Sequence, residues 1–312
     1  MARSEARSHA ADLDRAFEQA QANYLNRCSP GYRTRRIRWS GGETQIIEIG
    51  TGEPLLLLHG GGGYAAQWGP ILTALGKQHC VLAIDRPGHG LADPFNYHSA
   101  DLLAHAHRFI SDFLNGERLQ SISIAANSAG GFFAFSFALR SPERVRRLAL
   151  VGAPFSIARP QVPLPMRALF TPMLKPILHT MMSHPNRDRA RRMWKRVLVA
   201  YPERLPDDLL DLEIANQKRN HSTIFTFMGR LFDGGGVKQE FVLTDHWKKL
   251  SVPTTFIWGE RDSTMPIAAA EALAVVNQHF RVIRIPDVGH VPWFDDPNTV
   301  ADALNRAVNG SR

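Results

Sequence analysis

Short apolar segments alternate with longer helical patterns along most of this chain, and this alternation constrains the fold more than any other feature. Residues 55–58, all leucine, are too short and too uniformly apolar for an exposed strand but suit a buried parallel one. Similar strands are expected at 80–85, 122–126, 145–151, 254–258 and 281–285, with helices near 65–77, 100–115, 129–140 and 266–278. The alternation predicts an α/β fold with a mostly parallel central sheet, flanked by helices and joined by right-handed crossovers.

The N-terminal region stands outside this alternation. Residues 1–33 are expected to form a helical arm, because their helix-prone sequence carries one apolar stripe of Phe17, Tyr24 and Leu25. Such an arm would pack on the domain or on a partner subunit, so a homo-oligomer remains open. Two strands, 34–40 and 44–50, are expected to follow it.

A second region interrupts the alternation at 154–248. It carries helical patterns and frequent prolines but no convincing buried strand, and it is too long for a crossover. It predicts an inserted helical cap on a core formed by 34–153 and 249–312.

The net charge of +8 is concentrated in this cap segment, which holds 15 Lys and Arg against 9 Asp and Glu. A solvated helix surface at 187–196 is the favoured interpretation, and a cap that attracts an anionic substrate is the alternative. No nucleic-acid partner is expected, because no recognition motif accompanies the charge.

The location and cofactors are predicted mainly from features that the sequence lacks. No apolar run approaches the ~18 residues of a membrane span, and the first residues have no apolar signal core. Cys28 and Cys80 give no disulfide framework, and no Cys/His cluster has metal-ligand spacing. We expect a cytoplasmic protein without membrane contact, metal or cofactor.

Ser128 ends an apolar, alternating strand and is followed at once by a helical pattern. A direct strand-to-helix turn pushes the turning side chain out at the carboxyl edge of the sheet, as in a nucleophile elbow. The neighbours must be small there, and Ala126, Gly130 and Gly131 satisfy this. The alternative is a serine that only caps the helix.

A run of four glycines, 60–63, follows the 55–58 strand. Glycines let backbone N–H groups approach a substrate oxygen closely, and the sequence lacks the Lys-Ser/Thr or Rossmann spacing of a nucleotide loop. The N–H groups of Gly61 and Ala129 are therefore predicted to form an oxyanion hole. Gly60, Gly62, Asn127 and Val291 are the neighbouring substrate-pocket candidates.

Two more polar residues follow the last predicted strands. Asp262 can orient a histidine, with Glu260 as a competitor for that role, and His290 lies in a loop between Gly289 and Val291 where it suits a general base. A serine nucleophile needs such a base and such a carboxylate. Ser128, Asp262 and His290 are the predicted catalytic residues.

The order Ser…Asp…His makes the chain resemble the α/β-hydrolase superfamily over about 34–153 and 250–308. The segment 85–90, Asp-Arg-Pro-Gly-His-Gly, resembles the family's Asp-x-x-Gly-x-Gly turn, in which Asp85 and His89 would be structural or pocket-lining. The segment 289–297 resembles the family's Gly-His-x-Pro-x-x-Glu-x-Pro, with Asp295 in place of Glu. The resemblance implies an acyl-enzyme mechanism and a helical cap.

Within that superfamily, Ser128 argues against dehalogenases and epoxide hydrolases, which carry Asp at the elbow. Asn127, Gly130 and Gly131 match carbon–carbon hydrolases of meta-cleavage products, but those enzymes typically place Trp where this chain has Val291. A serine hydrolase of small-molecule carboxylic esters is therefore the main expectation. A carbon–carbon hydrolase or a noncatalytic ligand-binding member is the alternative.

The cap composition gives a loose hint about the ester. Methionine and aromatic side chains suit an apolar acyl or aromatic group, although packing of cap onto core is the favoured explanation for most of them. With the basic excess, an aromatic or acidic monoester such as a monoalkyl phthalate is one candidate. These cap residues are Met166, Phe170, Met173, Met181, Met182, Met193, Trp194, Phe225, Phe227, Met228, Phe232 and Phe241.

Overall fold

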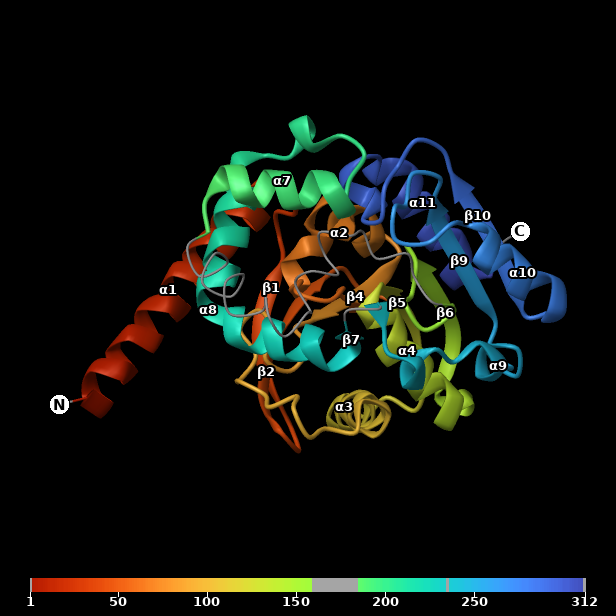
Figure 1. Cartoon of the computed structure of the whole chain (residues 1–312), viewed down its shortest axis with the longest axis horizontal. Coiled ribbons are helices and arrows are strands. Elements are labelled where there is room, and N and C mark those ends of the chain that lie inside the picture. Colours follow the sequence, from red (N-terminus) through yellow and green to blue (C-terminus); the bar gives the residue numbers. More distant parts are fainter. Residues whose placement is uncertain (1, 159–184, 234–235, 311–312) are drawn as a thin grey trace.

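The computed structural model describes residues 2–158, 185–233 and 236–310, and within them an eight-stranded sheet forms the centre of the molecule (Figure 1). The strand order is β1-β2-β4-β3-β5-β6-β9-β10. Only the pairs β1–β2 and β2–β4 are antiparallel, so the expected mostly parallel sheet is confirmed. The strands are β1 (Arg33–Trp39), β2 (Gly42–Ile49), β3 (Glu53–Leu58), β4 (His79–Ile84), β5 (Ile122–Asn127), β6 (Val145–Val151), β9 (Thr254–Gly259) and β10 (Phe280–Ile285).

Helices cover both faces of this sheet (Figure 1). They are α1 (Ala2–Cys28), α2 (Gly69–Gly76), α3 (Leu102–Gly116), α4 (Ala129–Arg140), α7 (Arg187–Val197), α8 (Asp207–Leu231), α9 (Thr244–Trp247), α10 (Ala268–Val276) and α11 (Pro297–Asn309). The helix expected at 65–77 is instead the 3-10 turn η1 (Ala65–Trp68) followed by α2, which has Pro70 in its first turn. A proline has no N–H to continue a preceding helix, which explains the break. Helix α11 was not expected.

The strand β3 shows why uniformly apolar segments form this sheet. Leu56 and Leu58 pack in the apolar cluster beneath α3 and α4, whereas Leu55 and Leu57 pack in the cluster with α2 and α11. Successive side chains of a strand point to opposite faces, so a strand covered on both faces must be apolar at every position.

The N-terminal helix α1 lies along α8, and its N-terminal end projects from one side of the molecule (Figure 1). The expected stripe of Phe17, Tyr24 and Leu25 is completely buried. Arg27 adds a two-pronged ion pair with Asp208 of α8, at 2.5 and 2.9 Å. The arm therefore packs on α8 of the same chain.

Between β6 and β9 the described residues are mainly helical, with α7, α8 and α9. They also include an antiparallel strand pair that was not expected, β7 (Phe232–Asp233) with β8 (Gly236–Val237). Strands of two residues are too short to give a period-2 pattern, so the sequence could not reveal them. The limits of the cap, 154–248, remain a prediction.

Candidate active site

Ser128 occupies the turn between β5 and α4 with φ +50° and ψ −113°. A positive φ is costly for a residue with a side chain and recurs at functional sites, the nucleophile elbow among them. A Cβ added at Gly130 would overlap the carbonyl oxygens of Leu58 and His59. The close approach of α4 to β3 therefore requires glycine at position 130, as the elbow pattern predicts.

His290 and Asp262 meet at the carboxyl ends of β9 and β10. The Nδ1 atom of His290 lies 2.8 Å from Oδ2 of Asp262, which also accepts the Ala153 N–H at 3.0 Å. The other oxygen, Oδ1, accepts the N–H and the hydroxyl of Thr264, at 2.9 and 2.6 Å. Because Asp262 is an acceptor at this contact, the His290 proton lies on Nδ1 and leaves Nε2 free to take a proton.

The contacts of Asp262 also keep it charged. Burial alone would raise the pKa of its carboxyl, but His290 and the hydrogen bonds from His290 and Thr264 outweigh burial, so the pKa is lowered. Thr264 was not among the predicted residues. Its position two residues after an orienting Asp is a turn-like spacing that could have indicated it.

Glu260, the competitor for the orienting role, points elsewhere. It is exposed and lies 3.3 Å from Nη1 of Arg284. The structure therefore brings Asp262, and not Glu260, to His290.

Asn127 joins the segment that carries Ser128 to the segment that carries His290. Its buried side-chain amide donates to the carbonyl of Val151 at 2.6 Å and to that of His290 at 3.1 Å. Gly152, with φ +74°, passes so close that a Cβ there would overlap the His290 carbonyl. Asn127 thus holds the two loops together, and its predicted contact with substrate remains a prediction.

The two predicted oxyanion donors are neighbours. A Cβ added at Gly61 would lie 3.5 Å from Cβ of Ala129, and one added at Gly60 would lie 3.4 Å from Cβ of Ser128. The first N–H groups of a helix have no intrahelical partner, which applies to Ala129 at the start of α4. Within the described ranges, the Gly61 N–H has no hydrogen-bond partner either.

Asp295 holds the His290 loop against the segment after α7. Its carboxylate accepts the Gly289 N–H at 2.8 Å and the N–H groups of Ala200 and Tyr201, both at 3.0 Å. This residue was noted only as the acid of the Gly-His-x-Pro motif. Val291, a predicted pocket residue, is buried in an apolar cluster, and its predicted contact with substrate is still a prediction.

Helix α8 covers the glycine loop with apolar side chains. A Cβ added at Gly61 would lie 3.1 Å from Sδ of Met228 and 3.8 Å from the Phe227 ring, and one at Gly62 would lie 3.4 Å from Ile224. Phe227 itself is completely buried in a packed cluster, and Trp194 and Phe241 are also buried in the packed clusters. The predicted cap residues Met166, Phe170, Met173, Met181 and Met182 lie outside the described residues.

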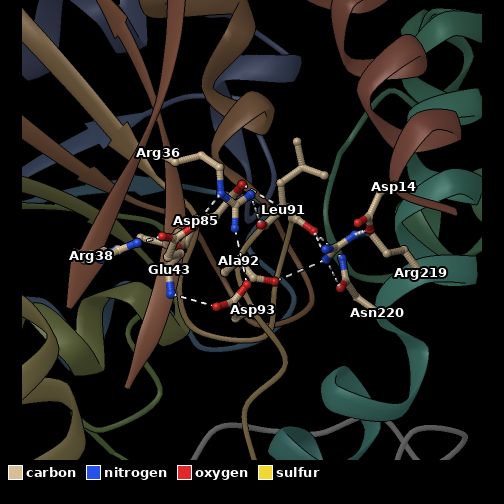
Figure 2. Close-up of polar contacts among 12 residues, drawn as sticks. Asp14, Arg36, Arg38, Glu43, Asp85, Leu91, Ala92, Asp93, Arg219 and Asn220 are labelled. Atoms are coloured by element: carbon tan, nitrogen blue, oxygen red, sulfur yellow. Dashed lines mark hydrogen bonds and ion pairs between the residues drawn. The ribbon is translucent and has the colours of Figure 1, made fainter. Parts of the chain in front are cut away.

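The loop after β4 is held from two sides (Figure 2). Arg219 of α8 pairs with Asp14 of α1 at 2.6 Å and donates to the Gly90 carbonyl at 2.6 Å, while Asn220 also donates to Gly90, at 2.8 Å. On the sheet side, Asp93 accepts the Glu43 N–H at 2.8 Å. The loop, α8 and α1 are therefore linked in one polar network.

Asp85 stabilises the start of this loop. Its buried carboxylate accepts the N–H groups of Ala65 and Leu91, at 2.7 and 2.9 Å, and burial raises its pKa to about 6. His89 is also completely buried, with Nδ1 2.9 Å from the Pro87 carbonyl oxygen.

Two arginines of α7 are paired on the surface with aspartates of α8. Arg187 binds Asp211 through two contacts, at 2.6 and 2.7 Å, and Arg191 lies 3.2 Å from Asp207. These pairs use two of the charges that could have attracted an anionic substrate, which favours the interpretation of a solvated helix surface.

A surface groove lies at the amino ends of β9 and β10, lined by Thr254, Thr255 and Arg281 among others. Ser128, Asp262 and His290 follow the carboxyl ends of their strands, where open α/β sheets bind ligands, so this groove does not belong to the candidate active site. In the part of the chain that the structure describes, no group of three or more His, Cys, Asp or Glu could hold a metal ion. None of the described helices is long and apolar enough to span a membrane.

Comparison with known proteins gives the class of the molecule. Residues 55–303 match the model of the alpha/beta hydrolase family, so the chain belongs to that family and is a hydrolase. The 2-hydroxy-6-oxononadienedioate/2-hydroxy-6-oxononatrienedioate hydrolase 2 of Pseudomonas putida is 28% identical over 290 residues, which cover 88% of this chain and 94% of the relative. A hydrolase of the same substrates from Cupriavidus pinatubonensis is 30% identical over 69% of this chain and 72% of its own length.

Solved structures share the fold. A carboxylesterase from Bacillus subtilis superposes with a TM-score of 0.77 at 20% identity, over 96% of this chain and 99% of its own. A meta-cleavage product hydrolase from Pseudomonas fluorescens gives 0.71 at 22% identity, over 89% and 98%. Both kinds of hydrolase thus use this architecture.

Proposed function

We propose that this protein is a serine hydrolase in which Ser128 attacks a carbonyl carbon to form an acyl-enzyme. Two observations support the proposal: His290 Nδ1 pairs with buried Asp262, and Ser128 has φ +50° at the strand-to-helix turn. His290 takes the serine proton at Nε2, and Asp262 stabilises the imidazolium that forms. The N–H groups of Gly61 and Ala129 bind the oxyanion.

The same groups complete the acyl-enzyme and then hydrolyse it. The leaving group takes the proton from His290 and departs, and His290 then removes a proton from water, which attacks the acyl carbon. Release of the acid restores the Ser128 hydroxyl.

For the substrate we propose a carboxylic ester with an apolar acyl or aromatic group. Ile224 and Met228 lie against the glycine loop and offer apolar contact there. Arg187 and Arg191 already pair with carboxylates of α8. These two arginines therefore give no reason to propose a free carboxylate on the substrate. Matched esters with and without a free carboxylate distinguish a neutral ester substrate from an acidic monoester. Faster hydrolysis of the monoalkyl phthalate than of the neutral ester would favour the acidic monoester as the substrate.

The second candidate is hydrolysis of a carbon–carbon bond in a vinylogous diketone. It is supported by the curated relatives that align over most of the chain and by the Asn127-Ser128-x-Gly130-Gly131 pattern. The oxyanion hole and the base would be the same for both reactions, so the substrate alone separates them.

The test is a panel of neutral esters, acidic monoesters and a vinylogous diketone with the wild type and Ser128→Ala. We expect Ser128→Ala to lose nearly all turnover of the preferred substrate and to escape labelling by a fluorophosphonate. The matched control is Ser136→Ala, because Ser136 is a buried serine on α4 that donates to the Phe132 carbonyl. This variant should keep both the turnover and the fluorophosphonate labelling. Labelling without turnover of any compound would favour a ligand-binding role, and turnover by Ser128→Ala would remove the proposed nucleophile.

A further inference from the structure

Arg86 is a completely buried arginine beside the candidate oxyanion hole. Its guanidinium faces two neighbouring aromatic rings, 5.0 Å from the centre of Phe133 and 4.9 Å from that of Phe227. Over residues 2–158, 185–233 and 236–310, no carboxylate lies within ion-pair distance of it. Burial lowers the pKa of Arg86 to about 10, so it remains a cation at neutral pH. A buried cation without a paired carboxylate lowers the stability of the fold, so the presence of Arg86 at this position needs an explanation.

Two hydrogen bonds of the Arg86 guanidinium end at the start of the glycine loop, and Nη2 also lies 3.5 Å from Nε2 of His89. Nε donates to the His59 carbonyl at 3.1 Å, and Nη2 donates to the Gly60 carbonyl at 2.7 Å. The Gly60 carbonyl has two further donors, Nδ1 of His59 at 2.9 Å and the N–H of Gly63 at 3.1 Å. Nε2 of His59 accepts the Arg86 N–H at 2.9 Å, which places the imidazole proton on Nδ1.

These donors act on the peptide that supplies one oxyanion donor. The carbonyl of Gly60 and the N–H of Gly61 belong to the same planar trans peptide and point in opposite directions. Donors that hold the carbonyl on one side therefore aim the Gly61 N–H to the other side. They also polarise the peptide, because hydrogen bonds in series strengthen one another, and a cation does so more than a neutral donor.

We propose that Arg86 is a positioning residue for the oxyanion hole, which acts through the Gly60–Gly61 peptide to orient the Gly61 N–H and strengthen it as a donor. This inference rests on the proposed function, in which that N–H binds the oxyanion. Charge develops on the substrate oxygen only in the transition state, so Arg86 should affect kcat far more than KM.

The first test compares Arg86→Met with the wild type on the preferred ester. Methionine fills the space against the two rings without charge or donors. We expect kcat to fall about 10–100-fold, below the full loss of an oxyanion donor, with KM within about threefold. Arg86→Lys keeps the charge but not the two-pronged geometry, so its kcat should lie between those of the wild type and Arg86→Met. It also serves as the test if Arg86→Met does not fold.

The second measurement separates positioning from general loop support. A trifluoromethyl ketone that resembles the substrate forms an oxyanion with Ser128, whereas the matched secondary alcohol does not. Arg86→Met should weaken binding of the ketone by about the same factor as kcat and leave binding of the alcohol unchanged. Arg144→Met is the matched control, because Arg144 also donates to two carbonyls, those of Leu119 and Gln120, but at the opposite end of the sheet.

The outcomes are distinct. If Ser128→Ala hydrolyses the ester as well as the wild type, the proposed function fails and this inference fails with it. If Ser128→Ala is inactive but folded Arg86→Met and Arg86→Lys keep kcat within threefold, only the role of Arg86 is overturned. Equal weakening of ketone and alcohol binding would also overturn it, because that result shows general loop support.

Discussion

Replacing Asp262 by Asn tests the orientation of the catalytic base most directly. In the wild type, Oδ2 accepts from His290 Nδ1 and the Ala153 N–H, and Oδ1 accepts from the Thr264 N–H. An asparagine NH₂ group at either position must face a backbone N–H, from Ala153 or from Thr264. One buried donor is then left unsatisfied, which costs about 1–3 kcal/mol of folding free energy.

The catalytic cost should be larger than the cost in stability. With NH₂ facing Nδ1, His290 has to carry its proton on Nε2, where it cannot receive the proton of Ser128. With the amide flipped, His290 keeps its tautomer but the imidazolium loses its neighbouring charge. We expect kcat to fall by about 10⁴-fold, equivalent to about 5 kcal/mol of transition-state stabilisation.

The assay is hydrolysis of the preferred ester, with urea unfolding to confirm that Asp262→Asn is folded. Glu260→Gln is the control, because Glu260 is exposed and pairs with Arg284. It should keep kcat/KM within about twofold. Folded Asp262→Asn with activity within tenfold of the wild type would refute the reasoning, since another group would then orient His290.

Three further predictions concern stability. Gly130→Ala should lower the free energy of unfolding by about 1–3 kcal/mol, because its Cβ would overlap the Leu58 carbonyl. Gly116→Ala is the control in thermal unfolding and should be neutral or stabilising, because its Cβ meets nothing within 4 Å. Burial raises the pKa of Glu213 to about 7, so the contribution of Glu213 to stability should fall as pH rises from about 4.3 to 7. Urea unfolding across that range should show that the free energy of unfolding of Glu213→Gln rises relative to that of the wild type as the pH increases. Arg219→Ala should lower the free energy of unfolding by about 1–3 kcal/mol, because the Arg219 side chain is only 12% exposed and joins α1, α8 and the Gly90 loop. Arg15→Ala should lower it by under about 0.5 kcal/mol, because the Arg15 side chain is 70% exposed. Equal losses of stability in urea unfolding would contradict the network of Figure 2.

The sequence predicted the sheet well because the strands are local and distinctive. Each expected core strand lies within one or two residues of the observed one, because the part of a parallel strand that is covered on both faces is apolar, as at 55–58. The unexpected helix α11 did have local signals. Asp296 caps it by accepting the Thr299 N–H, Pro297 begins it, and Gly310 ends it with φ +74°.

Contacts between distant segments could not be predicted in the same way. The elbow at Ser128 and the loops of Asp262 and His290 follow from strand ends, which meet at one edge of a parallel sheet. The bond from Arg86 to the Gly60 carbonyl depends on how two loops pack and on which way one peptide faces. Neither property leaves a pattern in a single sequence.

The site also explains why the family is clear while the substrate is not. The side chains that fix its loops bind backbone atoms. Asp262 binds the Ala153 N–H, Asn127 the His290 carbonyl, Asp295 the Gly289 N–H and Arg86 the Gly60 carbonyl. Every residue except proline offers both backbone groups, so these bonds tolerate wide changes in the loop residues they hold. Substrate choice must then depend on side chains that face the bound molecule, and Ile224 and Met228 over the glycine loop are the first positions to vary.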